Sequence, residues 1–173
     1  DEEVGCIGVH RLIDMLKKNT FKPNLCIVGE PTNMEVVLGH KGKCGHEVKV
    51  NGLACHSGQA PLGVNAINYA AKLISYISNI AVDKSKTGPF DHEYEIPYTT
   101  LHTGIISGGT AINIVPDSCT FEFEIRHIAE DNPKELVEKI KAYSKEYLIP
   151  QMLKISEKNT LLGYNKTSAC FFN

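Results

Sequence analysis

Residues 119–127, Cys119-Thr120-Phe121-Glu122-Phe123-Glu124-Ile125-Arg126-His127, alternate apolar and polar side chains along their whole length. A period of two is typical of a β-strand that has one buried face and one polar face. The pattern therefore predicts a strand in an antiparallel sheet that is covered on one side and open to solvent or to another surface on the other.

Helices are predicted on both sides of this strand in the sequence. Residues 63–80 place apolar side chains at three- and four-residue spacing. A second helix begins at Pro133, where Asn132 can cap it, and we expect it to end near Leu148, because Pro150 follows.

Three further strands are predicted at residues 43–50, 98–106 and 152–156. Residues 41–156 then have the order β-α-β-β-α-β. The predicted fold class is α+β, a ferredoxin-like domain in which two helices cover one face of a four-stranded antiparallel sheet.

The first 40 residues have a different organisation. A helix over 4–18 and short apolar runs at 25–28 and 35–38 predict a fragment of another α/β domain. The chain has no initiator methionine, which indicates a piece of a longer protein or a trimmed expression product. We expect residues 157–173 to be a partial return toward the first domain.

Composition excludes several classes of protein. The 173 residues carry a net charge of −2, so the basic surface of a nucleic-acid-binding protein is absent. No apolar run approaches the length of a membrane span, and no leader peptide precedes a cleavage site. Six cysteines without a C-x-x-C pair predict reduced thiols in a cytoplasmic protein.

Several carboxylates could carry chemistry. Glu2 and Glu3 are adjacent, so one could bind a metal while the other moves a proton; the alternative is a pair of solvated acids. Glu30 follows the apolar run at 25–28, and the carboxyl ends of strands in α/β sheets are where sites gather. The alternative for Glu30 is an ordinary acid in a turn.

Three further residues are candidates on the predicted sheet domain. His56 lies in a loop of small residues, where an imidazole could donate a hydrogen bond to a developing oxyanion. Asn113 follows Gly108 and Gly109, which allow close approach of a ligand or a neighbouring chain. Arg126 offers a two-pronged grip on a carboxylate, unless it is only a solvated strand residue.

The order of several short motifs resembles the acetylornithine deacetylase branch of the dinuclear-zinc aminoacylase and metallopeptidase family. The matching stretches run from residue 1 to about residue 127, with a weaker match to about residue 150. They are Asp1-Glu2-Glu3, Ile27-Val28-Gly29-Glu30-Pro31-Thr32, His40-Lys41-Gly42, His56-Ser57, Gly63-Val64-Asn65-Ala66-Ile67, Tyr98-Thr99-Thr100-Leu101, Gly108-Gly109-Thr110-Ala111-Ile112-Asn113 and Phe121-Glu122-Phe123-Glu124-Ile125-Arg126.

The resemblance implies a role for each candidate. Glu2 would be the general base, while Glu3 and Glu30 would each ligate one of two zinc ions, which cobalt could replace. His56 would steady the oxyanion in the partner subunit's site. Asn113 and Arg126 would hold the substrate's carboxylate or amide. Residues 1–40 would be part of the catalytic domain, and 41–156 a lid that forms a homodimer.

The sequence also departs from this family. The family has an upstream His-x-Asp and a late histidine, and neither occurs in this chain. A zinc pair needs more ligands than two carboxylates. We therefore expect the chain by itself to bind zinc weakly and to be inactive as a hydrolase.

Three functions follow from these features. The first is removal of the acetyl group from N2-acetylornithine in arginine biosynthesis. The second is a related reaction, that of the succinyl-diaminopimelate desuccinylases, carboxypeptidases or dipeptidases. The third is a non-enzymatic ferredoxin-like module for dimerisation or ligand binding, which would leave Glu2, Glu3 and Glu30 unexplained.

Overall fold

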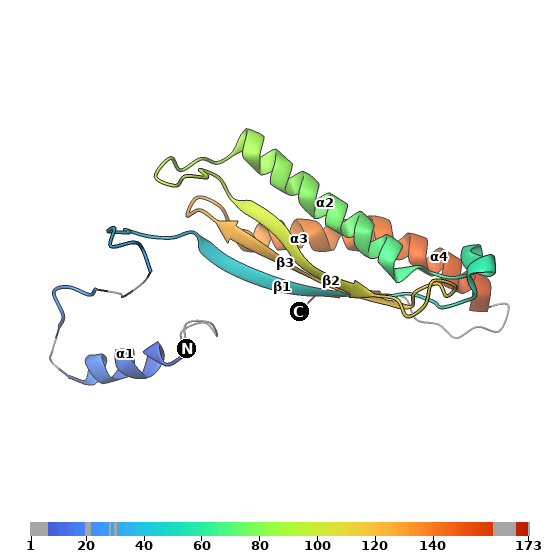
Figure 1. Cartoon of the computed structure of the whole chain (residues 1–173), viewed down its shortest axis with the longest axis horizontal. Helices are drawn as coiled ribbons and strands as arrows, with labels where there is room; N and C mark the ends of the chain where they lie inside the picture. Colours follow the sequence, from blue (N-terminus) through green and yellow to red (C-terminus); the bar gives the residue numbers. More distant parts are fainter. Residues whose placement is uncertain (1–6, 20–21, 28, 30, 161–168, 173) are drawn as a thin grey trace. The chain divides into compact units, whose positions relative to one another are not determined.

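The structure of the chain is a computed structural model that describes residues 7–19, 22–27, 29, 31–160 and 169–172 (Figure 1). The chain divides into two units, Asp1–Gly39 and His40–Asn173. Within the described ranges, none of the helices has the length and apolar character needed to cross a membrane.

The first unit contains one helix, α1 (Val9–Lys18), among its described residues. The prediction of strands in the two apolar runs is wrong for the residues that are described, because residues 25–27 and 35–38 form no strand. A strand forms only when a neighbour accepts and donates its backbone hydrogen bonds. Ile27 and Val36 remain 86% and 87% exposed, so these runs also lack a core to bury them.

The second unit is built on an antiparallel sheet of strands β1 (Gly42–Asn51), β2 (Thr100–Gly108), β3 (Ser118–His127) and β4 (Ala169–Phe172). Their order in the sheet is β2-β3-β1-β4. Strand β3 pairs with β2 on one side and β1 on the other (Figure 1). The period-two stretch around Phe121 is therefore a strand, as predicted, and it lies in the interior of the sheet.

The strand predicted at residues 152–156 is wrong. These residues belong to helix α4 (Ile149–Thr160), which continues from helix α3 (Pro133–Tyr143) through a π-helical turn, η3 (Ser144–Leu148). The strand beside β1 is instead β4, formed by residues that we expected to lead back toward the first domain.

The wide turn η3 explains why Pro150 does not end the helix. In a regular helix the ring of Pro150 would clash with the carbonyl of Glu146, four residues earlier. The π turn changes this spacing, because the backbone N–H of Ile149 donates to the carbonyl of Ser144, five residues back. Met152 is then placed on the buried face of the same helix, where it is fully inaccessible.

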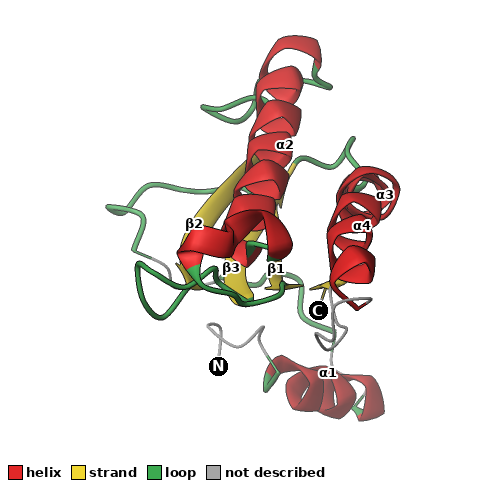
Figure 2. Cartoon of the chain, turned by 90° about the vertical axis from the view of Figure 1, so that its right-hand side faces the viewer, coloured by secondary structure: helices red, strands yellow, loops and turns green. Residues whose placement is uncertain are grey.

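Helices α2 (Ala66–Thr87), α3 and α4 lie on one face of the sheet (Figure 2). The core between the helices and the sheet is inaccessible to solvent. It contains Leu73 and Ile77 of α2, Ile140 of α3, and Val48, Val50, Phe121 and Ile125 of the sheet, each at most 1% exposed. The other face of β3 carries the polar set that alternates with these residues. The second unit is therefore a mixed α/β fold with a small antiparallel sheet.

Candidate functional site

The six candidate residues are described unevenly. Glu2, Glu3 and Glu30 lie outside the described residues, so their proposed roles remain predictions. His56, Asn113 and Arg126 are all described, and all three are exposed on the second unit. Among the residues that the structure describes, no group of three or more His, Cys, Asp or Glu side chains could hold a metal ion.

His56 is held at the beginning of the short 3-10 helix η2 (Ser57–Leu62), where it is the N-cap residue. Its Nδ1 atom accepts a hydrogen bond of 3.1 Å from the backbone N–H of Gly58. A ring nitrogen that accepts from an N–H carries no proton itself, so the neutral imidazole has its proton on Nε2. The local backbone thus presents Nε2–H as a hydrogen-bond donor.

The structure brings His56 and Asn113 together through their backbones. The N–H of Ser57 donates to the carbonyl of Asn113 at 2.9 Å, and His56 forms an isolated β-bridge with Ile114. The N–H of Val115 donates to the carbonyl of Cys55, also at 2.9 Å. Two segments that are about sixty residues apart in the sequence are therefore fixed side by side at one end of the sheet.

Close packing of glycine fixes the loop that leads to His56. A Cβ atom on Gly52 would lie 2.0 Å from the backbone carbonyl oxygen of Val64, which real side chains do not tolerate. The Gly52 N–H also donates to the carbonyl of Asp117 at 2.7 Å. Gly52 is thus a crossing point where three backbone segments meet.

This crossing gives a stability prediction. Gly52→Ala should lower the free energy of unfolding by about 1–3 kcal/mol, because the new methyl group must displace backbone. Urea denaturation of the 173-residue chain measures the change. Gly45→Ala is the matched control, since Gly45 in the exposed face of β1 has no atom within 4 Å of its Cβ position, and its effect should stay within about 0.5 kcal/mol. Equal losses in both variants would contradict the close packing at Gly52.

Arg126 lies toward the opposite end of the sheet. In the strand register it faces Lys43 of β1 and Thr100 of β2, whereas the end of β1 nearest His56 faces Ser118. Arg126 is eight residues beyond Ser118, or about 26 Å at ~3.3 Å per strand residue. One copy of the chain therefore does not bring Arg126 into a common site with His56 and Asn113.

The Arg126 side chain is paired locally. Its Nε atom donates to a carboxylate oxygen of Glu124 on the same face of β3, and the Arg126 side chain remains 46% exposed. An exposed pair of this kind adds little stability, so the guanidinium can exchange Glu124 for another carboxylate at small cost.

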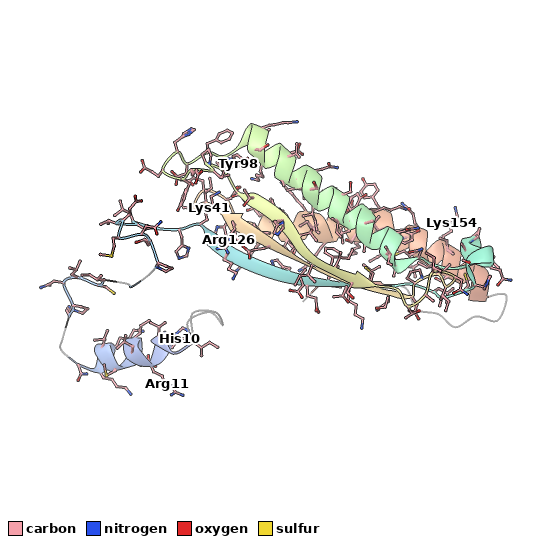
Figure 3. All side chains as sticks on the ribbon, in the orientation of Figure 1. His10, Arg11, Lys41, Tyr98, Arg126 and Lys154 are labelled. Carbon is pink, nitrogen blue, oxygen red and sulfur yellow. The ribbon has the colours of Figure 1, made fainter. Side chains whose placement is uncertain are left out.

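Sequence reasoning gave no individual role to Lys41, which lies at the same end of the sheet as Arg126 (Figure 3). Its Nζ donates to the carbonyl of Tyr98 at 2.6 Å and lies 5.8 and 5.9 Å from the ring centres of Tyr94 and Tyr98. Burial lowers the pKa of Lys41 below its usual value. Lys41 thus ties the beginning of β1 to the loop before β2.

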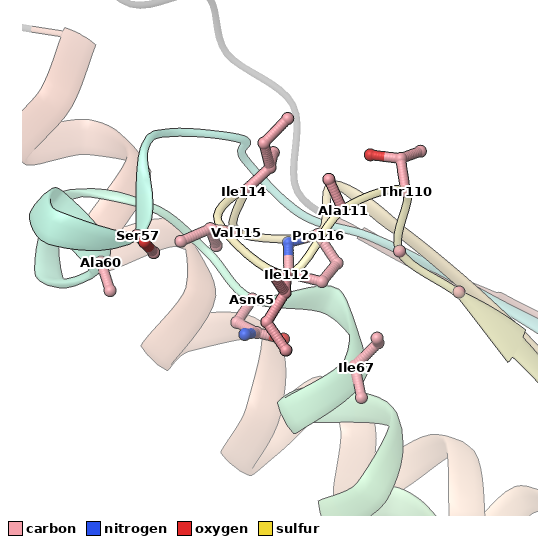
Figure 4. Close-up of a pocket in the computed structure, with 12 residues that line it drawn as sticks. Ser57, Ala60, Asn65, Ile67, Thr110, Ala111, Ile112, Ile114, Val115 and Pro116 are labelled. Carbon is pink, nitrogen blue, oxygen red and sulfur yellow. The ribbon is translucent and has the colours of Figure 1, made fainter.

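A pocket of about 540 Å³ adjoins the His56–Asn113 end of the sheet. Its walls come from η2, from the beginning of α2 and from residues 108–116 between β2 and β3 (Figure 4). Ser57 lines it, and the same residue donates its backbone N–H to Asn113. Sequence patterns did not reveal this pocket, because its walls come from separate segments.

Comparison with known proteins identifies the family of the second unit. Residues 38–152 match the M20 peptidase dimerisation domain family. The chain is 33% identical over 136 residues to an acetylornithine deacetylase of Myxococcus xanthus, covering 79% of this chain and 35% of that protein. It is 34% identical over 134 residues to a protein of Aspergillus clavatus named "Probable carboxypeptidase", covering 78% and 32%. The chain spans about a third of the length of these curated relatives.

Solved structures show the same fold. A protein of methicillin-resistant Staphylococcus aureus, described as an aminohydrolase, superposes with a TM-score of 0.53 at 16% identity, over 77% of this chain and 29% of that one. A Burkholderia cenocepacia protein described as an amidohydrolase or peptidase gives 0.50 at 19% identity, over 78% and 27%. Together with the match over residues 38–152, which form most of the second unit, these likenesses show that the chain belongs to the M20 peptidase dimerisation domain family.

Proposed function

We propose that this chain is part of a metal-dependent amidohydrolase that converts N2-acetylornithine and water into ornithine and acetate, a step of arginine biosynthesis. The observation that carries the proposal is the hydrogen bond from the Gly58 N–H to Nδ1 of His56, which favours the tautomer with its donor on Nε2. Similarity to acetylornithine deacetylases supports the choice of substrate. The free thiols of Cys44, Cys55 and Cys119 agree with a cytoplasmic location.

In this proposal the two units have different roles. Residues 1–40 belong to the catalytic domain, and the second unit is its lid, with a ferredoxin-like arrangement of the sheet and helices. Glu3 and Glu30 offer carboxylate oxygens, which suit zinc and also cobalt, and each would ligate one metal ion together with groups supplied outside this chain. Two bound zinc ions would lower the pKa of the attacking water and polarise the amide carbonyl.

The residues of the chain would handle protons and charge. Glu2 would take a proton from the attacking water and return it to the leaving amine as the amide C–N bond breaks. Nε2–H of His56 would donate to the oxyanion of the tetrahedral intermediate, where the carbonyl oxygen gains negative charge. Asn113 and Arg126 would hold the substrate's carboxylate or amide, and the guanidinium has a geometry that matches a carboxylate.

The separation of about 26 Å between Arg126 and the His56 end of β1 supports a dimeric site. Strand β2 lies at one edge of the sheet. If two copies of β2 pair antiparallel about a two-fold axis, the beginning of one β2 meets the end of the other. Arg126 of one copy then lies at the same end of the joined sheet as His56 and Asn113 of the partner copy, where one site could use all three.

A substrate panel on the metal-loaded, full-length protein tests the proposal. N2-acetylornithine should give the highest kcat/KM, ahead of N-succinyl-diaminopimelate and a set of dipeptides. The carboxypeptidase reaction is the second candidate, because identity to the Aspergillus clavatus protein is equally high. Best turnover of a succinylated diamine or of a peptide would overturn the deacetylase assignment. The 173-residue chain alone should bind zinc weakly and show no deacetylation.

A further inference from the structure

The pocket beside His56 has a lining without charge. Its walls are glycine, alanine, proline and valine together with the isoleucines Ile67, Ile112 and Ile114, and its polar members are Ser57, Asn65 and Thr110. The Oδ1 atom of Asn65 is already occupied, because it caps α2 by accepting from the N–H of Asn68 at 3.0 Å. A charged group that entered the pocket would find no counter-charge in the lining.

The pocket lies against the two segments that carry His56 and Asn113. Ser57, which lines the pocket, directly follows His56, and its N–H is bonded to the Asn113 carbonyl. Ile112 directly precedes Asn113 and also lines the pocket (Figure 4). The same two segments therefore carry the proposed site residues and form walls of this pocket.

The loop over the pocket is held in place. Gly109 has a φ of +81°, and a Cβ atom there would lie 3.3 Å from the Cδ1 atom of Ile67. The backbone thus rests close against the Ile67 side chain. Ile112, three residues after Gly109 in the same loop, is completely exposed in the single copy. An isoleucine in this position has no role in the core, and contact with a ligand would remove its apolar surface from water.

We propose that this pocket receives the acyl group of the substrate and selects uncharged acyl groups over dicarboxylic ones. The proposal rests on the proposed function, since that function places an amide carbonyl at His56. Neither the ornithine ammonium nor a succinyl carboxylate has a charged partner in the lining. A volume of about 540 Å³ exceeds what an acetyl group fills, so propionyl and butyryl groups should also be accommodated.

Binding to the metal-free, full-length protein tests the pocket without any turnover. N2-butyrylornithine and N2-succinylornithine are titrated separately, and the isoleucine methyl signals are followed by NMR. Ile67→Val and Ile112→Val assign the two signals. The butyryl compound should shift both signals, and the succinyl compound should shift them less at the same concentration. Equal shifts, larger shifts with the succinyl compound, or no shift with either compound would overturn the acyl pocket.

Turnover by the metal-loaded protein separates this proposal from the proposed function. Each added methylene, from acetyl to butyryl, should raise kcat/KM by about fourfold, the ratio expected for burying one methylene group. Succinyl should fall at least about tenfold below acetyl. If none of the N-acyl ornithines is hydrolysed while butyryl-selective binding is seen, the deacetylase function fails and the pocket stands. Faster hydrolysis of the succinyl compound than of all three uncharged ones overturns the pocket.

Changing the charge of the wall gives a matched pair of variants. Ile112→Lys places a cation beside the pocket and should lower the acetyl-to-succinyl ratio of kcat/KM by about tenfold or more, whereas Ile112→Asp should raise it. Leu153→Lys on α4 is the control, because Leu153 is a partly exposed apolar residue outside the lining, and it should leave the ratio unchanged. An unchanged ratio in Ile112→Lys, with binding and turnover intact, would contradict the role of this wall.

Discussion

Replacing His56 with alanine in the full-length protein is expected to lower kcat by about 10²–10³-fold while the zinc content stays the same. This is the range typical of losing one donor to an oxyanion. The expectation follows from the hydrogen bond between the Gly58 N–H and Nδ1, which makes Nε2 the donor. Metal analysis of the purified variant, alongside steady-state kinetics, separates a lost donor from a lost metal.

Two further variants sharpen this test. His56→Gln retains an N–H donor and should recover part of the rate lost in His56→Ala. His92→Ala is the control, because His92 belongs to the loop before β2, near Phe90, and should leave kcat unchanged. If His56→Ala kept the full kcat, the oxyanion role would be wrong. If it lost zinc, His56 would have to be reassigned as a residue that maintains the metal site.

A mixed dimer shows which subunit His56 serves. A dimer that combines one His56→Ala chain with one Glu2→Gln chain has a site in which both groups are intact, provided that His56 acts in the partner's site. Each homodimer should be inactive, and the mixed dimer should recover up to half of the wild-type activity. No recovery in the mixed dimer would place His56 and Glu2 of the same chain in one site.

The sequence predicted those parts of the fold in which local chemistry and burial agree. Strand β3 has strict alternation, and its apolar residues Phe121 and Ile125 are fully buried. The beginning of α3 was also predictable, because Asn132 accepts from the Lys134 N–H and so caps the helix. In both cases a few adjacent residues carry the physical cause, so no distant contact is needed.

The prediction failed where a distant or unusual feature decides the structure. Pro150 predicts the end of a helix, but the π turn before it allows the helix to continue. Leu148 and Met152, four residues apart, face the core together and had the spacing of a helix. The run at 25–27 is apolar enough for a strand, yet nothing among the described residues of its unit pairs with it.

The site was predictable in composition and only partly in geometry. His56 and Asn113 were chosen from their own loops, and their proximity depends on the backbone bond between Ser57 and Asn113, which no local pattern encodes. Arg126 was correctly placed on the polar face of β3, but its distance from His56 follows from strand register. The pocket beside them combines segments from η2 to residue 116, so only the folded chain reveals it.

A second large effect is expected at the free edge of the sheet. The double variant Ile105→Lys/Ile106→Lys should convert the proposed full-length dimer into a monomer and lower kcat by at least about 10²-fold, as much as His56→Ala. Ile105 and Ile106 are 58% and 52% exposed on β2, an edge strand of nine residues. The other edge strand, β4, spans only four residues, so it offers a shorter edge for pairing. Lysine at an edge is a common means of preventing strand pairing between chains.

Sedimentation velocity measures the oligomeric state, and thermal unfolding shows whether the variant retains its fold. Leu153→Lys provides the control for adding a lysine at an apolar position away from β2, and it should remain dimeric and active. A folded double variant that stayed dimeric would show that β2 is not the interface. A monomer with full kcat would contradict the shared site, because catalysis would then not require Arg126 of one copy together with His56 of the partner copy.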